Sequence, residues 1–260
     1  MGCICVRSIC VAVRRICFTL AGSGGSRGEV IILSDVNETV PIRHYPSIDS
    51  TNLEAHRLFQ SGERGPLYLL ADEQTAGKGR LDRNWASLRG NCYSTLILPL
   101  NVQLQSVPQI SFVVALAVAD VVRQHTNAKP QLKWPNDVLV GGAKIAGILC
   151  EVLSQNSLTV AIGCGINVAH APTGLAYPAT CLVAEGANIE RDDVFQSYRQ
   201  ALTYWFGMWN FGQGFSTIRT AWMQQATGIG ETVTMTVGTQ HLTGRFEGIT
   251  EQGAVIVKPA

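Results

Sequence analysis

A short polar segment, AGKGRLDRNW at residues 76–85, combines small residues with closely spaced cations. Two glycines two positions apart allow the backbone to approach a ligand closely. Lys78, Arg80 and Arg83 supply cationic donors, which suits a phosphate or another anion. The segment lacks the spacing of a Walker A loop, and an aspartate replaces the third glycine of a dinucleotide fingerprint. Taken alone, it fits a solvated loop as well as an anion site.

A second segment, residues 133–151, reads KWPNDVLVGGAKIAGILCE. Asn136 and Asp137 fall in a turn between two expected strands, and Lys144 begins the next strand after a double glycine. A lysine at a strand start can aim its ammonium into a cleft and neutralise charge that builds on a phosphorus during nucleotidyl transfer. The alternative is an ordinary hairpin that carries a surface lysine.

The DSTN segment supplies small polar side chains just before an expected helix. Ser50 and Thr51 are natural helix N-caps. Their hydroxyls, together with the amides of Asn52 and Gln74, could instead hydrogen-bond a neutral polar head in an apolar pocket. A ureido group is such a head.

The IGCGINV segment, residues 162–168, ends an apolar strand with small residues. The missing side chains leave room for a flat group such as adenine, and Asn167 could donate to it or accept from it. A bulge or tight turn at a strand end is the alternative.

The elements that must position these segments follow from periodicity and turn residues. A strand after Arg43 leads to a helix that begins with a capping-box pattern at Thr51–Glu54 and stops at Gly62. Later strands follow one another through short turns, which predicts antiparallel pairing. The expected strands are 29–33 (or the end of an N-terminal extension), 66–71, 91–100, 132–134, 138–140, 144–153 and 158–168, and the expected helices are 107–127, 191–209 and 215–225. From residue 228 the sequence alternates with frequent turn residues, which predicts a small all-β module.

Composition limits the class of protein. With 46% hydrophobic and 15% charged residues, the chain of 260 residues is globular. Residues 1–30 hold four arginines and one glutamate, so the remainder is slightly acidic and lacks the charge excess of a nucleic-acid-binding protein. We find no apolar run near the roughly 20 residues of a membrane span.

The eight cysteines and the N-terminal segment indicate a compartment. The cysteines show no zinc-ligand spacing, so we expect no metal site, and scattered single cysteines suit a reducing cytosol. Residues 1–28 are basic, and their apolar stretch is broken by Arg14 and Arg15. We therefore expect a disordered extension, or a start assigned too far upstream, rather than a signal peptide.

In their order and spacing, the four segments resemble the biotin protein ligases. The resemblance runs from about Tyr45 to the C-terminus, and the combination of GKGRxxRxW with KWPND and KIAGIL is highly specific. It implies an α+β fold: a mixed-sheet catalytic domain with helices on one side, related to class II aminoacyl-tRNA synthetases and lipoate ligases. A small SH3-like β-barrel follows it. The implied domains are residues 29–227 and 228–260.

The resemblance also implies roles for residues. Lys144 and Arg80 would be catalytic. The implied biotin-binding residues are Ser50, Thr51, Asn52, Gln74, Lys78, Gly79, Arg80, Lys144 and Gly147. The implied nucleotide-binding residues are Arg83, Trp85, Asn136, Asp137 and Asn167.

The implied reaction joins biotin to AMP from ATP, with Mg²⁺, and then passes biotin to a lysine of a biotin carboxyl carrier protein. That carrier would be an acetyl-CoA carboxylase subunit. The resemblance further implies a cytoplasmic protein, a possible homodimer, and neither a nucleic-acid nor a membrane partner.

The chain departs from the family pattern at three places. Lys78 and Asp82 stand where the family often has Arg and Gly. About 40 residues without a two-helix pattern precede the catalytic domain, which implies a ligase without a DNA-binding domain. The tail ends at VKPA, a strand short of the usual barrel. A lipoate or octanoyl ligase, a DNA-binding biotin sensor and an inactive binding module are the alternatives.

Overall fold

The computed structural model describes residues 40–237 and 240–259. The expected strand at 29–33 and the expected extension at 1–28 lie outside the described residues.

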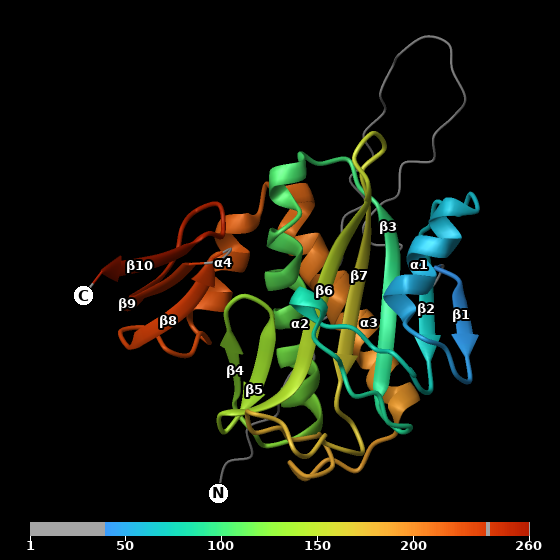
Figure 1. Ribbon diagram of the computed structural model, residues 1–260, viewed down its shortest axis with the longest axis horizontal. Helices are drawn as coiled ribbons and strands as arrows, with labels where there is room; N and C mark the ends of the chain where they lie inside the picture. The colour runs from blue at the N-terminus through green and yellow to red at the C-terminus, as the bar shows by residue number, and fades with distance from the viewer. Residues whose placement is uncertain (1–39, 238–239, 260) are drawn as a thin grey trace, which may run out of the picture. The chain divides into compact units, whose positions relative to one another are not determined.

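A seven-stranded mixed sheet forms the centre of the larger part, in the order β1-β2-β3-β7-β6-β5-β4 (Figure 1). Its strands are β1 (Ile42–Tyr45), β2 (Leu67–Ala71), β3 (Cys92–Pro99), β4 (Pro130–Lys133), β5 (Asp137–Val140), β6 (Ala143–Ser154) and β7 (Thr159–Ile166). β1 and β2 pair in parallel, and all other neighbours are antiparallel. The predicted antiparallel run of strands is therefore confirmed.

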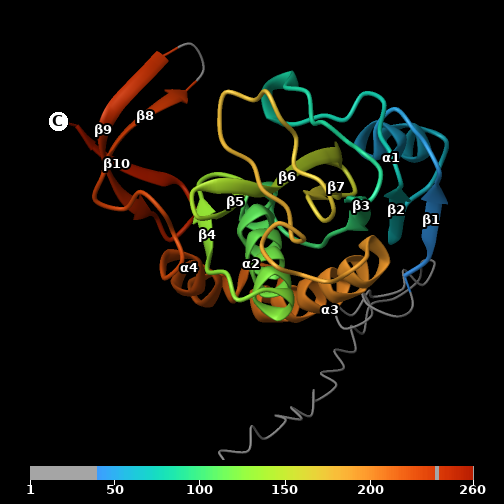
Figure 2. The same ribbon diagram turned by 90° about the horizontal axis from the view of Figure 1, so that it is seen from below.

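Helices cover both faces of this sheet. α2 (Gln109–His125) and α3 (Arg191–Trp209) lie on one face, and α1 (Thr51–Gln60) lies on the other (Figure 2). The strand side chains divide in the same way, because alternate residues point to opposite faces. On β2, Tyr68 joins the large core under α2 and α3, whereas Leu69 joins a small cluster under α1. The expectation that helices lie on one side is therefore wrong for α1.

The α2 helix is buried almost all round, since the sheet covers one side and α3 the other. The span Leu104–His125 is long and apolar enough to cross a membrane, which corrects the expectation that no such run exists. However, 72% of its most apolar window is buried inside the protein. Because burial within a fold accounts for its composition, α2 is a core helix.

One hairpin turn and the start of one helix position the site. Gly141 and Gly142 have φ values of +56° and +82°, as a two-residue hairpin turn requires, and they place Lys144 at the start of β6. The expected capping box is absent at α1. Ser50 is the N-cap but its side chain makes no capping bond, and the hydroxyl of Thr51 bonds to Gln74 instead. The polar side chains at this helix start therefore serve another purpose.

The last helix and the C-terminal strands follow the predicted order. α4 (Phe215–Met223) ends two residues before the prediction. β8 (Thr232–Val237), β9 (Gln240–Ile249) and β10 (Val255–Pro259) form a three-stranded antiparallel sheet. The prediction of a small all-β module at the end of the chain is confirmed.

Candidate active site

One cavity of about 700 Å³ gathers thirteen of the fourteen predicted site residues, all but Asn167. It lies over β5, β6 and β7, beside the start of α1 and the loop between β2 and β3. Sequence reasoning missed other lining residues, among them Ser94, Lys133, Cys164, Tyr177, Glu231 and Phe246. Ser94 could have been found from the alternation of β3, but nothing local in the sequence points to Tyr177 or Glu231.

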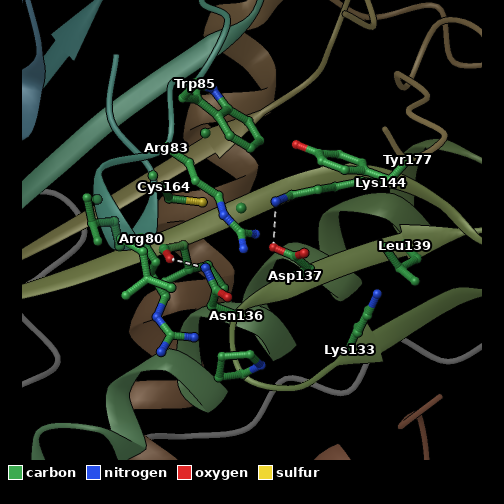
Figure 3. A pocket seen from close by; sticks show the side chains of 18 of the residues that line it. Arg80, Arg83, Trp85, Lys133, Asn136, Asp137, Leu139, Lys144, Cys164 and Tyr177 are labelled. Carbon is green, nitrogen blue, oxygen red and sulfur yellow. Dashed lines mark hydrogen bonds and ion pairs between the residues drawn. The ribbon is translucent and has the colours of Figure 1, made fainter. Parts of the chain in front are cut away.

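Lys144 occupies the middle of this cavity (Figure 3). Its Nζ lies 2.6 Å from Oδ1 of Asp137, 5.0 Å from the centre of the Trp85 ring and 5.4 Å from the centre of the Tyr177 ring. The Lys144 side chain is only 14% exposed. A cation that is largely withdrawn from water interacts strongly with an anion placed beside it, because little solvent screens the pair.

The Asn136–Asp137 turn is fixed to β6. The Asn136 amide donates to the carbonyl of Ile148 at 2.7 Å, and the backbone N–H of Ile148 donates to the carbonyl of Asn136. The Asn136 amide thus holds the turn, while the Asp137 carboxylate faces Lys144.

A segment after β7 forms hydrogen bonds with the backbone of Lys144. The N–H of Lys144 donates to the carbonyl of Pro178, and the carbonyl of Lys144 accepts from the N–H of Thr180. The Asn167 amide donates to the carbonyl of Thr180 at 2.9 Å, but its Oδ1 is buried without a partner. Asn167 lines a much smaller neighbouring cavity with Trp85 and Tyr177.

The Trp85 indole packs directly on the glycines of two neighbouring strands. A Cβ atom added at Gly147 or at Gly165 would lie 2.7 Å from this ring. Glycine is therefore required at both positions. The sequence predicted room for a flat group at this strand end, and at Gly165 the structure fills that room with the protein's own indole.

The opposite end of the cavity carries neutral polar groups. The Oε1 of Gln74 accepts from the N–H of Thr51 at 2.8 Å, and its Nε2 donates to the hydroxyl of Ser87 at 2.9 Å. The amide of Asn52 is equally occupied, because it donates to Glu151 and accepts from Thr95. Ser50 is a buried residue that lines the cavity, and its hydroxyl has no hydrogen-bond partner within the described part of the chain.

The loop between β2 and β3 carries the cations to the mouth of the cavity. Backbone bonds from Gly79 to Arg83 and from Trp85 to Gly77 hold the loop in shape. The side chains of Lys78, Arg80 and Arg83 are exposed there. The cavity thus has cationic donors at its mouth, a lysine in its middle and neutral polar groups at its inner end. This arrangement suits an elongated ligand with a phosphate at one end.

Comparisons with known proteins agree with this geometry. The model of the "Biotin/lipoate A/B protein ligase family" matches residues 45–167, and the model of the "Biotin protein ligase C terminal domain" matches residues 228–259. A "Biotin--[acetyl-CoA-carboxylase] ligase" of Paracoccus denitrificans is 36% identical over 81% of this chain and 91% of the relative. The "Bifunctional ligase/repressor BirA" of Bacillus subtilis (strain 168) is 31% identical over 95% of this chain and 79% of the relative.

Among solved structures, the "Biotin protein ligase from Aquifex aeolicus in complex with biotin and ATP" is similar. It superposes with a TM-score of 0.72 at 26% identity, over 84% of this chain and 91% of that one. This chain belongs to the biotin/lipoate A/B protein ligase family, and within it to the biotin protein ligases.

Proposed function

We propose that this chain is an ATP-dependent biotin protein ligase, which forms biotinyl-5′-AMP and then transfers biotin to one lysine of a biotin carboxyl carrier protein. One observation carries the proposal: the Lys144 ammonium lies in a single cavity between a neutral polar end and a cationic mouth. A relative named for acetyl-CoA carboxylase supports a carboxylase carrier as the acceptor.

In the first step, the carboxylate of biotin attacks the α-phosphorus of ATP, and pyrophosphate leaves. The ureido head would lie at Ser50, Thr51 and Gln74, which brings the carboxylate toward Lys144. Two anions must meet there, so the ammonium of Lys144 lowers their repulsion and the charge on the phosphoryl oxygens. Gly147, with the Trp85 indole packed on it, would line the space that biotin occupies between the ureido site and Lys144.

Magnesium fits this site as a partner of the triphosphate. The described residues contain no cluster of three or more metal-binding side chains. Mg²⁺ usually keeps several waters and binds one or two carboxylates plus substrate phosphates, and the Asp137 carboxylate, which lines the cavity, would serve as such a ligand. When bound, the ion would neutralise phosphate charge while Asn136 holds the turn that carries Asp137.

The adenine ring would lie beside Trp85 and Asn167. The Oδ1 of Asn167 is a buried acceptor without a partner, and the 6-amino group of adenine is a donor that could satisfy it. The indole N–H of Trp85 is also buried and unpaired. Both groups line the small cavity next to Lys144, so adenine could enter there when the indole moves.

In the second step, the amine of the carrier lysine attacks the mixed anhydride, and AMP leaves. Water would destroy the anhydride, so the loop that carries Lys78, Gly79, Arg80 and Arg83 must stay closed between the steps. Because these cations are exposed at the mouth, the same loop can open to admit biotin.

Several broader features belong to the same proposal. We infer a catalytic domain at 29–227 related to class II aminoacyl-tRNA synthetases and lipoate ligases, and an SH3-like module at 228–260. The family-model matches at 45–167 and 228–259 support this division. We further propose that the enzyme is cytoplasmic and assembles as a homodimer. We also propose that it has no nucleic-acid partner, because the chain beyond residue 30 is slightly acidic.

ATP–pyrophosphate exchange on the purified chain tests the proposal, with biotin, with lipoate and with neither. Exchange that requires biotin is expected. Exchange with lipoate alone would instead place the protein with the lipoate ligases, and no exchange by a folded protein would indicate an inactive binding module.

A further inference from the structure

Lys133, the last residue of β4, lines the cavity but has no role in the reaction described so far. Its side chain is exposed, and no hydrogen bond or ion pair joins it to another of the described residues. Lys144, by contrast, is paired with Asp137 at 2.6 Å. The ammonium group of Lys133 is therefore available to a ligand.

The register of the sheet places Lys133 next to Asp137 and close to Lys144. Lys133 on β4 is paired with Asp137 on β5, and Leu139 on β5 is paired with Lys144 on β6. Paired residues of antiparallel strands point to the same face, and so do residues two apart on one strand. The side chains of Lys133, Asp137 and Lys144 therefore share the face of the sheet on which the cavity lies (Figure 3).

The order of the strands sets a direction for ATP. Asn167 follows β7, Lys144 lies at the start of β6, and Lys133 lies at the end of β4, all at the same end of the sheet. Neighbouring strands are about 4.8 Å apart, so β4 lies about 10 Å beyond β6. An ATP molecule with its adenine at Asn167 and its α-phosphorus at Lys144 thus extends its β- and γ-phosphates toward β4.

The leaving group of the first step benefits from a cation at this position. When the carboxylate of biotin attacks, the bond from the α-phosphorus to the oxygen that bridges to the β-phosphate breaks, and pyrophosphate takes the electron pair. A fixed cationic donor beside the developing charge stabilises it. Glu231 also lines the cavity, but within the described residues it makes no ion pair with Lys133, so it does not occupy the ammonium group.

We infer that Lys133 binds the β- and γ-phosphates of ATP and the pyrophosphate that leaves. This inference rests on the proposed function, in which ATP is the substrate that carries the phosphates. It assigns Lys133 to the first half-reaction alone, because biotinyl-5′-AMP contains no pyrophosphate.

The test separates the two half-reactions in three variants. Lys133→Gln removes the charge, and Lys133→Arg keeps it. Lys129→Gln is the matched control, because Lys129 is also an exposed lysine but lies outside the cavity. Pyrophosphate exchange gives KM for ATP, for pyrophosphate and for biotin. A separate assay measures the transfer of biotin from synthetic biotinyl-5′-AMP to a biotin carboxyl carrier protein.

Lys133→Gln is expected to raise KM for ATP and KM for pyrophosphate about tenfold, the worth of about one charge-assisted hydrogen bond. KM for biotin and the rate of transfer from biotinyl-5′-AMP are expected to stay at the parent values. Lys133→Arg should restore both raised KM values, and Lys129→Gln should behave as the parent in both assays. Because Lys133 is exposed, all three variants should keep the melting temperature of the parent.

The remaining outcomes distinguish failure of the inference from failure of the proposed function. If the parent requires biotin for exchange but Lys133→Gln leaves KM for ATP and for pyrophosphate unchanged, the inference is wrong and the proposed function stands. If Lys133→Gln slows transfer from biotinyl-5′-AMP as much as it impairs exchange, Lys133 does not act through pyrophosphate, and the inference is again refuted. If the parent shows no exchange that depends on biotin, the proposed function itself fails, and the inference fails with it.

Discussion

Replacing Lys144 by alanine tests the centre of the proposed site. The Lys144 ammonium forms an ion pair with Asp137 at 2.6 Å and is largely withdrawn from water. A phosphoryl oxygen about 4 Å from this cation would be attracted by about 4 kcal/mol at an effective dielectric constant of about 20. If that attraction is realised in the transition state, its loss slows adenylation by about three powers of ten.

The assay is ATP–pyrophosphate exchange at saturating biotin, with a melting curve for each variant. The melting temperature should fall by only a few degrees, because the change leaves Oδ1 of Asp137 buried and unpaired but disturbs no core packing. Lys129→Ala, an exposed lysine outside the cavity, is the control and should exchange at the parent rate. Exchange by Lys144→Ala within tenfold of the control would refute the role of Lys144.

Three further predictions concern the loop, the packing under the indole and the acid stability. Arg80→Gly should still form the adenylate but release it, so that bystander lysines become biotinylated; labelling confined to the carrier would contradict this role. Gly165→Ala places a methyl group 2.7 Å from the Trp85 ring, which must move by about 1 Å to reach ordinary contact, so exchange should fall at least tenfold. Gly207→Ala, where an added Cβ meets no atom within 4 Å, should exchange normally, and an equal loss in both variants would contradict the packing argument. The Arg57 guanidinium hydrogen-bonds Asp49 and lowers the pKa of that carboxyl from 3.8 to about 2, so this stabilisation is present above pH 3.8 and is lost as the pH falls toward 2. Arg57→Leu should therefore lower the free energy of unfolding at pH 7 by no more than about 1 kcal/mol, because the pair is exposed. It should also make the free energy of unfolding fall less steeply between pH 3.8 and about pH 2. An unchanged dependence on pH in denaturant titrations would refute this assignment.

Most of the fold could be predicted from the sequence because its elements are defined locally. Alternating apolar residues and short turns define the run from β4 to β7, and the double glycine before Lys144 has the positive φ values expected of its turn. The face covered by α1 was not predictable, because its weak apolar stripe says nothing of which side of the sheet receives it. Tertiary packing decided that side.

The capping-box error at α1 has a physical cause. Ser50, Thr51 and Glu54 have the right types and spacing for local capping bonds. In the folded chain, the Thr51 hydroxyl bonds to Gln74 and Thr95, and the Glu54 carboxylate bonds to Arg57. For Thr51 the partners that replace the cap are distant in sequence, and only the tertiary structure brings them close, whereas Glu54 pairs with an arginine one turn further along the same helix.

The sequence by itself determined which residue types could do the chemistry, because the small, cationic and amide-bearing residues occur in four short segments of characteristic spacing. The tertiary structure decided how they are used. It set Lys144 between Asp137 and two aromatic rings, packed Trp85 on the glycines of two strands, and committed the Asn52 amide to Glu151 and Thr95. These arrangements depend on contacts between distant segments, and a hydrogen bond or an ion pair exists only where folding brings its two partners together.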